Sequence, residues 1–493
     1  MARTSSQLAA IVVTALPFLL PCVLHAQTEG ILVEQALVPS PVPDLVAEEH
    51  LVPVTVYRPA DGASRPTLLW GHGWSGSRAD SEGDGHWFDA RGYNVVAMDF
   101  RGHGDARATS FARVHDVNFE IRDTSAVIDW IANRPWAALD RAADPKLGAL
   151  GGSYGGGYQL LTAAFDDRLD AIAPEITWND LVQSLAPNGV IRTAWNDLLY
   201  GAGVALANLD PFLHESYAWG TTMNELPDGQ LPGEPDAVGQ FTASSPASYL
   251  DAIDVPTLLV QGVPDTLFNL NQAVHNREQI AATRSPVKLV TFLEGHLLPG
   301  LQPPGGGEPC GDHRLEILTW YDKHLKGLDV DTGPAIEMAL DDGTCLTSRG
   351  EPRLLRARPT PVQLGGASVV GPMPGAAFDL PIPDAQAGDV LAGLPRLTGS
   401  ITVTLGPEAI VFFSLVANGP SGERVLASQL TPLRKAAGIA PLALELAGVA
   451  SRLRMGESLV LRITTHEDQF AQNGARAPFQ AAFAALVLEL PLH

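Results

Sequence analysis

The segment that most constrains the fold is Gly151-Gly-Ser153-Tyr-Gly155, which lies between two patterned stretches. It follows the apolar run Leu147–Gly151, a predicted buried strand, and precedes an apolar stretch near Tyr158 that predicts a helix. Glycines two residues before and after a serine allow the strained strand-to-helix turn of a nucleophile elbow, which projects the hydroxyl outward. We therefore expect Ser153 to be a nucleophile. A plain glycine-rich turn is the alternative.

The surrounding pattern indicates an α/β fold. Short apolar runs alternate with helical-period segments from about residue 50 to 325, which is typical of parallel strands joined by helices. The predicted strands are His50–Tyr57, Thr67–Trp70, Asn94–Phe100, Leu147–Gly151, Ala171–Ile176, Thr257–Gln261 and Val287–Leu293, and the clearest helices are 118–135 and Leu315–Leu325. Residues 177–250 break this alternation and are rich in aromatic side chains, so we expect an inserted helical cap there.

After a short stretch at Gly327–Gly333, which we interpret as a linker, the periodicity changes. Short strand-like runs separated by turn residues replace the helices, which favours an all-β sandwich. The predicted domains are thus an α/β domain over residues 27–330, with its cap at 177–250, and a β-sandwich over residues 331–493.

A serine nucleophile needs a base and an acid that orients the base, and in this fold both follow later strands in the order acid, then histidine. Asp265 comes shortly after the strand Thr257–Gln261, and His296 comes directly after Val287–Leu293. We predict that Asp265 orients His296 and that His296 takes the proton of Ser153. The competing candidates are His313, His275, Asp251 and Asp254.

An acyl-transfer site also needs N–H donors for the developing oxyanion. Gly71-His72-Gly73-Trp74 follows a predicted strand, so the backbone N–H groups of Trp74 and Tyr154 are the predicted donors. A glycine turn with His72 packed beneath it is the alternative. Asp99 and Arg101 are expected to tie loops together near the site, and Trp178, Trp195 and Tyr200 are candidates for an acyl pocket.

At these residues the chain resembles the X-Pro dipeptidyl-peptidase and cocaine esterase (CocE/NonD) family of α/β-hydrolases. The resemblance rests on Gly-Gly-Ser153-Tyr-Gly-Gly, Gly262-Val-Pro-Asp265-Thr-Leu-Phe268, Gly295-His296 and Trp320-Tyr-Asp-Lys-His-Leu-Lys-Gly327 followed by Thr332-Gly-Pro334. It implies a helical cap, a C-terminal sandwich of jelly-roll type, and Ser153, Asp265 and His296 as the triad. Cocaine esterase-like members use a tyrosine side chain as the second oxyanion donor, where this chain offers the backbone or indole N–H of Trp74.

The N-terminus has the layout of a secretory signal peptide. Arg3 precedes an apolar run from Leu8 to Leu24, and cleavage after Ala26 fits the small-residue requirement, so residues 1–26 are predicted to be removed. A membrane anchor is the alternative. In an oxidising compartment Cys310 and Cys345 are candidates for a disulfide that would fasten the second domain to the active-site side, with two free thiols as the alternative.

Together these features predict a secreted or periplasmic serine hydrolase that cleaves an ester or amide through an acyl-enzyme. An X-Pro dipeptidyl aminopeptidase is the alternative within the same class, and a non-catalytic carbohydrate-binding protein is the alternative outside it. We expect a small ester or peptide substrate, no metal and no organic cofactor. The net charge of −23 argues against nucleic acid and anionic membranes as partners, and we expect no stable membrane association after signal cleavage.

Overall fold

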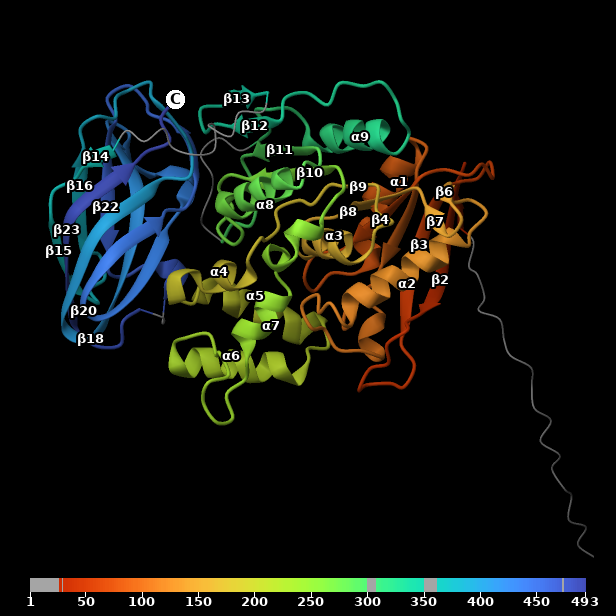
Figure 1. The fold of residues 1–493 in the computed structure, drawn as a ribbon, viewed down its shortest axis with the longest axis horizontal. Helices are drawn as coiled ribbons and strands as arrows, with labels where there is room; N and C mark the ends of the chain where they lie inside the picture. The colour runs from red at the N-terminus through yellow and green to blue at the C-terminus, as the bar shows by residue number, and fades with distance from the viewer. Residues whose placement is uncertain (1–25, 29, 299–306, 350–360, 472–473) are drawn as a thin grey trace, which may run out of the picture.

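Two sheets of different construction divide the chain. The computed structural model describes residues 26–28, 30–298, 307–349, 361–471 and 474–493. An eleven-stranded sheet carries the helices, and an eight-stranded sheet forms a separate all-β domain. Figure 1 shows the mixed domain on the right, the all-β domain on the left and the cap helices below and between them. The predicted α/β-hydrolase fold with a cap and a C-terminal β domain is confirmed.

The centre of the first sheet is parallel, and its strands are buried on both faces. This explains why they appear in the sequence as nearly continuous apolar runs. Within the sheet, the order of these strands is β3 (Leu51–Pro59), β5 (Asn94–Met98), β4 (Thr67–Gly71), β8 (Leu147–Leu150), β9 (Ala171–Ile172), β10 (Thr257–Gly262), β11 (Val287–Phe292) and β12 (Ile336–Ala339). All neighbours from β5 to β12 pair in parallel, and β3 pairs antiparallel with β5.

Helices cover both faces of this sheet. One hydrophobic cluster joins strands to α1 (Glu82–Asp89) and α9 (His313–His324). A second cluster joins them to α2 (Glu120–Ala132) and α3 (Tyr154–Phe165). Helix α8 (Leu270–Ala282) packs in a third cluster near the all-β domain. The loops at the carboxyl ends of the strands therefore lie between helices that pack on the two faces of the sheet.

The sheet extends further at both edges than the sequence indicated. Strands β1 (Ala26–Thr28) and β2 (Ile31–Pro39) add an antiparallel edge next to β3. At the other edge, β12 and β13 (Cys345–Ser348) continue the same sheet. The domain boundary predicted at residue 331 is therefore wrong, because these two strands pair with the first sheet and the second sheet begins only at β14 (Pro361–Gln363).

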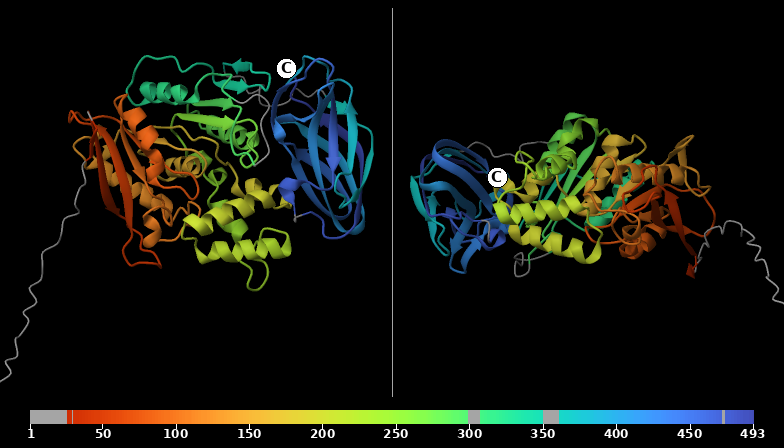
Figure 2. Two further views of the ribbon diagram at one scale, coloured as in Figure 1. Left: turned by 180° about the vertical axis from the view of Figure 1, so that it is seen from behind. Right: turned by 90° about the horizontal axis from the view of Figure 1, so that it is seen from below.

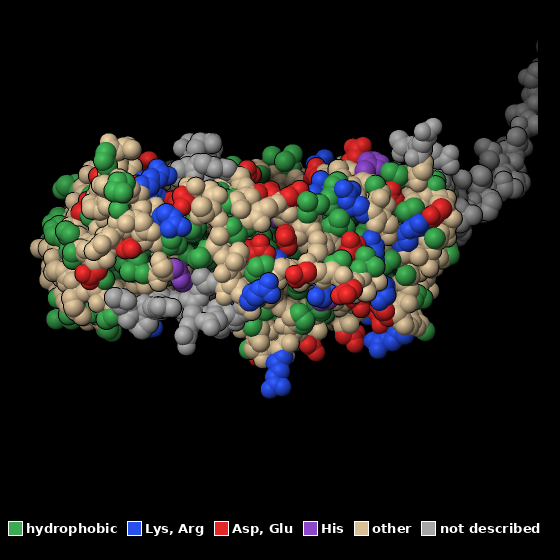
Figure 3. Space-filling view, turned by 90° about the horizontal axis from the view of Figure 1, so that it is seen from above, with side chains coloured by type: hydrophobic (Ala, Val, Ile, Leu, Met, Phe, Trp, Pro, Cys, Tyr) green, Lys and Arg blue, Asp and Glu red, His purple; other side chains and the backbone are tan. Residues whose placement is uncertain are grey.

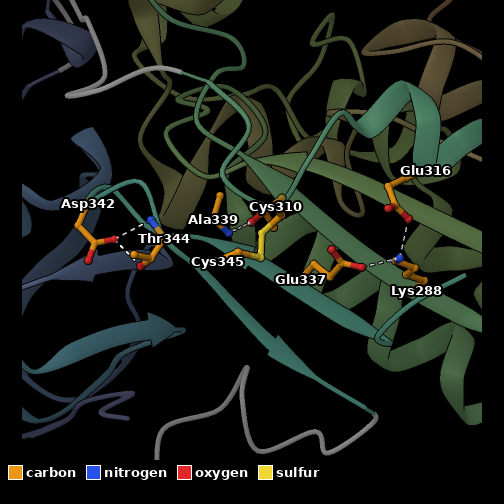
Figure 4. The surroundings of a disulfide bond; sticks show 9 residues. Lys288, Cys310, Glu316, Glu337, Ala339, Asp342, Thr344 and Cys345 are labelled. Carbon is orange, nitrogen blue, oxygen red and sulfur yellow. Dashed lines mark hydrogen bonds and ion pairs between the residues drawn. A yellow bond between two sulfur atoms is a disulfide. The ribbon is translucent and has the colours of Figure 1, made fainter.

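Cys310 and Cys345 form a disulfide, as the sequence allowed. Because Cys345 lies on β13, the bond joins two parts of the first domain, and the expectation that it fastens the second domain is wrong. Figure 4 shows it beside Lys288, which lies between the carboxylates of Glu316 and Glu337 at 2.7 and 2.6 Å. The disulfide ties the edge strand β13 to the segment before α9, and Lys288 on β11 links α9 to β12.

Residues 177–250 form the expected cap over the carboxyl edge of the sheet. It contains the helices α4 (Leu181–Leu185), α5 (Thr193–Leu206), α6 (Pro211–Met223) and α7 (Ala237–Ala243). Asp180, Asp210 and Asp236 each accept a backbone hydrogen bond at the start of α4, α6 and α7. Such caps satisfy N–H groups that a helix leaves without an acceptor, so these carboxylates define the helix starts.

The C-terminal domain is a twisted antiparallel sheet that curls around its own apolar core, as Figure 2 shows from two further sides. Strand β18 (Arg396–Gly419) pairs with β20 (Thr431–Glu445), β22 (Ser458–Thr464), β23 (Phe479–Glu489) and β19 (Gly422–Val425). The remaining strands of the C-terminal domain are β15 (Ala367–Gly371), β16 (Ala377–Ile382), β17 (Val390–Gly393) and β21 (Val449–Arg452). In the first domain, β6 (Leu139–Arg141) and β7 (Asp144–Pro145) form a small hairpin.

Three observations concern the predictions about membranes, nucleic acid and the signal peptide. Within the ranges described above, no helix is both long and apolar enough to cross a bilayer. On the face drawn in Figure 3, acidic and basic side chains are interspersed. Residues 1–25 of the predicted signal peptide lie outside the described residues.

Candidate active site

Ser153 lies at a sharp turn between β8 and α3. Its backbone has φ 59° and ψ −118°, a strained conformation for a residue with a side chain, and its N–H donates to the carbonyl of Glu175 at 2.9 Å. Gly155 lies so close to β4 that a Cβ atom there would be 2.0 Å from the carbonyl oxygen of Gly71. Gly151 has φ +131° and is equally crowded. The glycines of the motif thus permit the close approach that the turn requires.

The three residues predicted to act together lie in hydrogen-bond contact. His296 Nε2 is 2.9 Å from Ser153 Oγ, and His296 Nδ1 is 2.6 Å from Asp265 Oδ2. Asp265 follows β10, and His296 follows β11, so neighbouring parallel strands deliver both groups to the same edge. A serine bonded to an imidazole that a carboxylate orients can lose its proton as it attacks a carbonyl carbon.

The carboxylate of Asp265 is fully buried and held by several donors. Besides the His296 ring, the backbone N–H of His296 donates to Oδ2 at 3.0 Å. The N–H groups of Leu267 and Phe268 donate to Oδ1 at 2.9 and 2.8 Å. Edge-on contacts from Phe268 and Trp195, with ring centroids at 5.3 and 5.9 Å, flank the imidazole. These contacts fix the plane of the ring toward Ser153.

The competing candidates have other partners. His313 contacts Glu175 and Glu308 at 3.4 and 2.9 Å. Burial lowers the pKa of His313, but these two carboxylates outweigh that effect and raise it to about 9. His275 contacts Glu445 at 2.9 Å. Asp254 lies before β10, where it accepts a hydrogen bond from Ser285 Oγ of another loop at 2.7 Å.

The predicted oxyanion donors flank Ser153. Tyr154 opens α3, and the first N–H groups of a helix have no acceptor within the helix, so its N–H is available beside Ser153. Trp74 lines the same cavity as Ser153 and Tyr154. Its indole Nε1–H donates to the carbonyl of Leu199 in the cap at 2.9 Å. Of the two groups that the sequence offered at Trp74, the backbone N–H is therefore the one left for this role.

Three buried histidines pack behind these donors. His115 stacks on the ring of Tyr154 at 3.6 Å, and its Nε2 is 2.7 Å from the Tyr154 carbonyl. His72 bonds to the Gly73 carbonyl and accepts from the N–H of Phe100. Burial lowers the pKa of His72 to about 4 and those of His103 and His115 to about 3. These imidazoles are therefore neutral packing groups at neutral pH.

An apolar cavity opens at Ser153. It contains about 1030 Å³ of space, including the part open to solvent. Helices α4 to α7 of the cap supply most of its wall. Leu267 and Phe268 also line it, and they belong to the loop after β10 that carries Asp265, which we call the acid loop. Trp178 and Tyr200 line it as expected, whereas Trp195 donates its indole N–H to Thr266 Oγ1 at 3.1 Å. Asp197 is the one carboxylate among the described residues of this lining.

Two buried arginines support the loops around the site, and the sequence indicated only one of them. Arg192, at the start of α5, is buried and donates to the carbonyl of Thr266, which follows Asp265. Arg101, expected to tie loops together, is fully buried and bonds to Asp123 and Asp44. No local motif marks Arg192, because its role depends on the cap folding back onto the acid loop.

A metal would need a different donor set. Within the described ranges, Cys310, Glu337 and Cys345 form the one grouping with metal-ligand spacing, and both sulfurs are joined in the disulfide. A disulfide sulfur is not a thiolate ligand.

A family profile and several known proteins match parts of this chain. The profile of the X-Pro dipeptidyl-peptidase (S15) family matches residues 49–297. The quorum-quenching protein AidA of Acinetobacter baumannii is 29% identical over 27% of this chain and 43% of its own length. A Mycobacterium bovis protein named as a serine esterase is 33% identical over 27% of this chain and 20% of its own length. The chain thus spans less than half of either relative.

A solved structure extends the likeness to both domains. A CocE/NonD family hydrolase of Staphylococcus aureus superposes with a TM-score of 0.69 at 14% identity, over 95% of this chain and 96% of that one. At such identity the match establishes the shared fold. The family profile covers half of the chain and spans Ser153, Asp265 and His296. The alternative of a non-catalytic carbohydrate-binding protein is set aside, since the chain belongs to the X-Pro dipeptidyl-peptidase (S15) family and is a hydrolase.

Proposed function

We propose that the protein is a carboxylic ester hydrolase in which Ser153, His296 and Asp265 act as nucleophile, base and orienting acid. Ser153 Oγ attacks the ester carbonyl carbon while His296 Nε2 takes its proton. The protonated imidazole then gives this proton to the leaving alkoxide, and an acyl-Ser153 ester remains. Water, deprotonated by the same imidazole, attacks the acyl group and releases the acid and free Ser153.

In this proposal the backbone N–H groups of Tyr154 and Trp74 receive the oxyanion of each tetrahedral intermediate. The position of Tyr154 at the first turn of α3 supports its part, because the helix N-terminus also favours negative charge. The bond from the Trp74 indole to Leu199 holds that turn against the cap.

The observation that carries the ester assignment is the apolar cavity at Ser153. Its lining near the nucleophile is dominated by side chains such as Trp178, Leu181, Leu213 and Phe241. An apolar acyl group gains free energy by leaving water for such a cavity, at about 0.8 kcal/mol per buried CH₂. We infer that the cavity takes an uncharged acyl chain.

The family match favours a second candidate, release of X-Pro dipeptides. Such an enzyme must bind the ammonium group of the substrate, which calls for carboxylates that converge on the pocket. Two acidic side chains of the cap have structural partners, since Asp180 caps α4 and Asp210 caps α6 and contacts Arg113 at 3.1 Å. Asp197 accepts from the Tyr217 hydroxyl at 2.9 Å. One engaged carboxylate is a weak ammonium site, so the ester reading is preferred.

Turnover of p-nitrophenyl esters and of Ala-Pro-p-nitroanilide by the full chain separates the two candidates. We expect ester hydrolysis, with kcat/KM rising up to about fourfold per added acyl CH₂ from acetate to hexanoate. Ser153→Ala serves as the control for non-enzymatic hydrolysis. Faster release from Ala-Pro-p-nitroanilide than from every ester would establish the peptidase instead.

Secretion is part of the proposal. The apolar run from Leu8 to Leu24 and the Cys310–Cys345 disulfide both suit an exported protein, because disulfides persist mainly in oxidising compartments. Expression in a bacterial host with intact secretion should give a periplasmic protein whose N-terminal residue is Gln27. A cytoplasmic product that retains residues 1–26 would contradict secretion.

A further inference from the structure

The loop that carries Asp265 also contacts the C-terminal domain. The main-chain carbonyl of Asp265 accepts a hydrogen bond from Gln429 Nε2 at 2.8 Å. The same amide is 3.5 Å from the carbonyl of Val263. Gln429 belongs to the C-terminal domain and is only 4% exposed, and Asp265 is fully buried. The hydrogen bond between the Gln429 amide and the Asp265 carbonyl is therefore removed from water. A residue 164 positions away thus contacts the backbone of the acid itself.

The backbone that presents Gln429 is strained. It follows the short 3₁₀ turn η7 (Leu426–Ser428), in which Ala427 and Ser428 have φ of 52° and 56°. Residues other than glycine rarely adopt this left-handed conformation, because it is strained when a Cβ atom is present. Leu426 anchors the turn in the core of the C-terminal domain. Strain of this kind persists only where the surroundings enforce it.

The contact lies within a shared interface. One apolar cluster contains Val263 and Leu293 from the hydrolase domain together with Leu394 and Ala450 from the C-terminal domain. The second domain also reaches the acid loop through the cap, because Phe470 packs under the guanidinium of Arg192 with 5.5 Å between Cζ and the ring centroid. Arg192 in turn donates to the carbonyl of Thr266. Two consecutive main-chain carbonyls of the acid loop, those of Asp265 and Thr266, therefore accept hydrogen bonds from Gln429 and Arg192.

We propose that Gln429 is a positioning residue that the C-terminal domain supplies to the active site, an inference that rests on the proposed role of Asp265 as the orienting acid. Its amide fixes the peptide plane of Asp265 and thereby the direction of the carboxylate toward His296. The C-terminal domain then contributes to catalysis without touching substrate.

Gln429→Met tests this inference, since methionine has a similar length and no donor. We expect kcat on a p-nitrophenyl ester to fall about tenfold while KM stays within about twofold, because orientation of the imidazole matters in the transition state and not in substrate binding. A poorly held carboxylate also stabilises the imidazolium less. The acidic limb of the kcat/KM profile should therefore move to lower pH, by about half a unit.

The matched control is Asn271→Ala. Asn271 crosses the same interface, with its Nδ2 bonded to Glu445 and Leu446 and its Oδ1 accepting from Gly448, and these three hydrogen bonds all go to the C-terminal domain. This variant should lower Tm and leave kcat and the pH profile at wild-type values. Loss of stability at the interface is thereby separated from loss of positioning.

A Gln429→Met protein that does not fold is replaced by Gln429→Asn, which keeps the amide and shortens it by one CH₂. Its expected effects have the same direction and are smaller. A folded variant of either kind with wild-type kcat and an unmoved acidic limb overturns the inference. Asp265→Asn is measured in parallel: if it too retains full activity, the role of Asp265 as the acid fails, whereas a large loss there confines the failure to Gln429.

Discussion

Ser153 and its flanking donors are held almost wholly by the hydrolase domain, whereas Asp265 and His296 depend on three parts of the chain. On the nucleophile side, β4, β8 and α3 meet at glycines that leave no room for a Cβ atom. The neutral rings of His72 and His115 pack behind Tyr154. Neighbouring strand ends and one helix start are enough to define this side.

The acid side is built differently. The cap contributes Arg192 and Trp195 to the loop that follows Asp265, and the C-terminal domain contributes Gln429. One sheet and α3 therefore supply most contacts of the nucleophile side, to which the cap adds the hydrogen bond between Trp74 and Leu199, whereas the cap and the C-terminal domain both support the acid side. Changes remote from the chemistry should affect the acid side more.

The largest expected effect of a conservative change is on the acid side itself. Asp265→Asn keeps the shape of the side chain but removes the charge and leaves the imidazole in the wrong tautomer, for which serine proteases provide the precedent of a loss of about 10⁴ in kcat. Steady-state hydrolysis of a p-nitrophenyl ester measures it.

Asp254→Asn is the matched control, since this carboxylate precedes the same strand and bonds to Ser285. It should keep the wild-type rate. An Asp265→Asn protein that retains more than about a tenth of wild-type kcat would move the acid role to another carboxylate.

The nucleophile side should show a smaller effect, on stability in acid. His72, His103 and His115 have folded-state pKa values of about 3 to 4 because they are buried, below the value of about 6.5 expected when unfolded. Below pH 6.5 the unfolded chain binds protons that the folded chain does not, so stability is full above pH 6.5 and falls as the pH drops. We expect a loss of the order of 1–2 kcal/mol of unfolding free energy per histidine between pH 7 and pH 5.

Thermal melting of the wild type and of His115→Gln across this range tests the effect. The two proteins must be compared because burial raises the pKa values of Asp89 and Asp170 to about 6 and that of Glu120 to about 8, and these carboxylates stabilise the fold as the pH falls. His115→Gln keeps a donor for the Tyr154 carbonyl and removes one titrating group, so its Tm should fall less steeply with acid. An equal change of Tm in the two proteins between pH 7 and pH 5 would show that His115 is not linked to folding. His313 has the opposite sign, since its raised pKa stabilises the fold only until the pH rises through about 9.

The difference between the nucleophile side and the acid side also explains which parts of the site the sequence could predict. The motif at Ser153 and the positions of Asp265 and His296 after their strands are local signals, because parallel strands bring their carboxyl ends to one edge. The edge strands β12 and β13 lay beyond the predicted linker, where no helix separates them from the all-β pattern that follows. Periodicity alone did not assign them to the first sheet.

Long-range contacts left no trace in the sequence. Gln429 lies in a stretch that resembles any turn between strands, and its meaning depends on how two domains dock. In the sequence, strand β18 appears as two separate apolar runs, Ile401–Leu405 and Ile410–Leu415, because its register shifts between Val403 and Glu408, where Leu405 and Gly406 have positive φ. The cavity wall likewise depends on how four cap helices fold over Ser153.

Reaction with a fluorophosphonate ester, followed by peptide mass spectrometry, tests the central claim most directly, because this reagent labels a serine only where a base activates its hydroxyl. We predict one adduct, on the peptide that contains Ser153, with loss of ester hydrolysis in step with labelling. Ser153→Ala should take no label and lose nearly all activity, as removal of the nucleophile from such a unit costs about 10⁶ in kcat. Labelling of a different serine, or retention by Ser153→Ala of more than about a hundredth of the wild-type rate, would contradict the assignment.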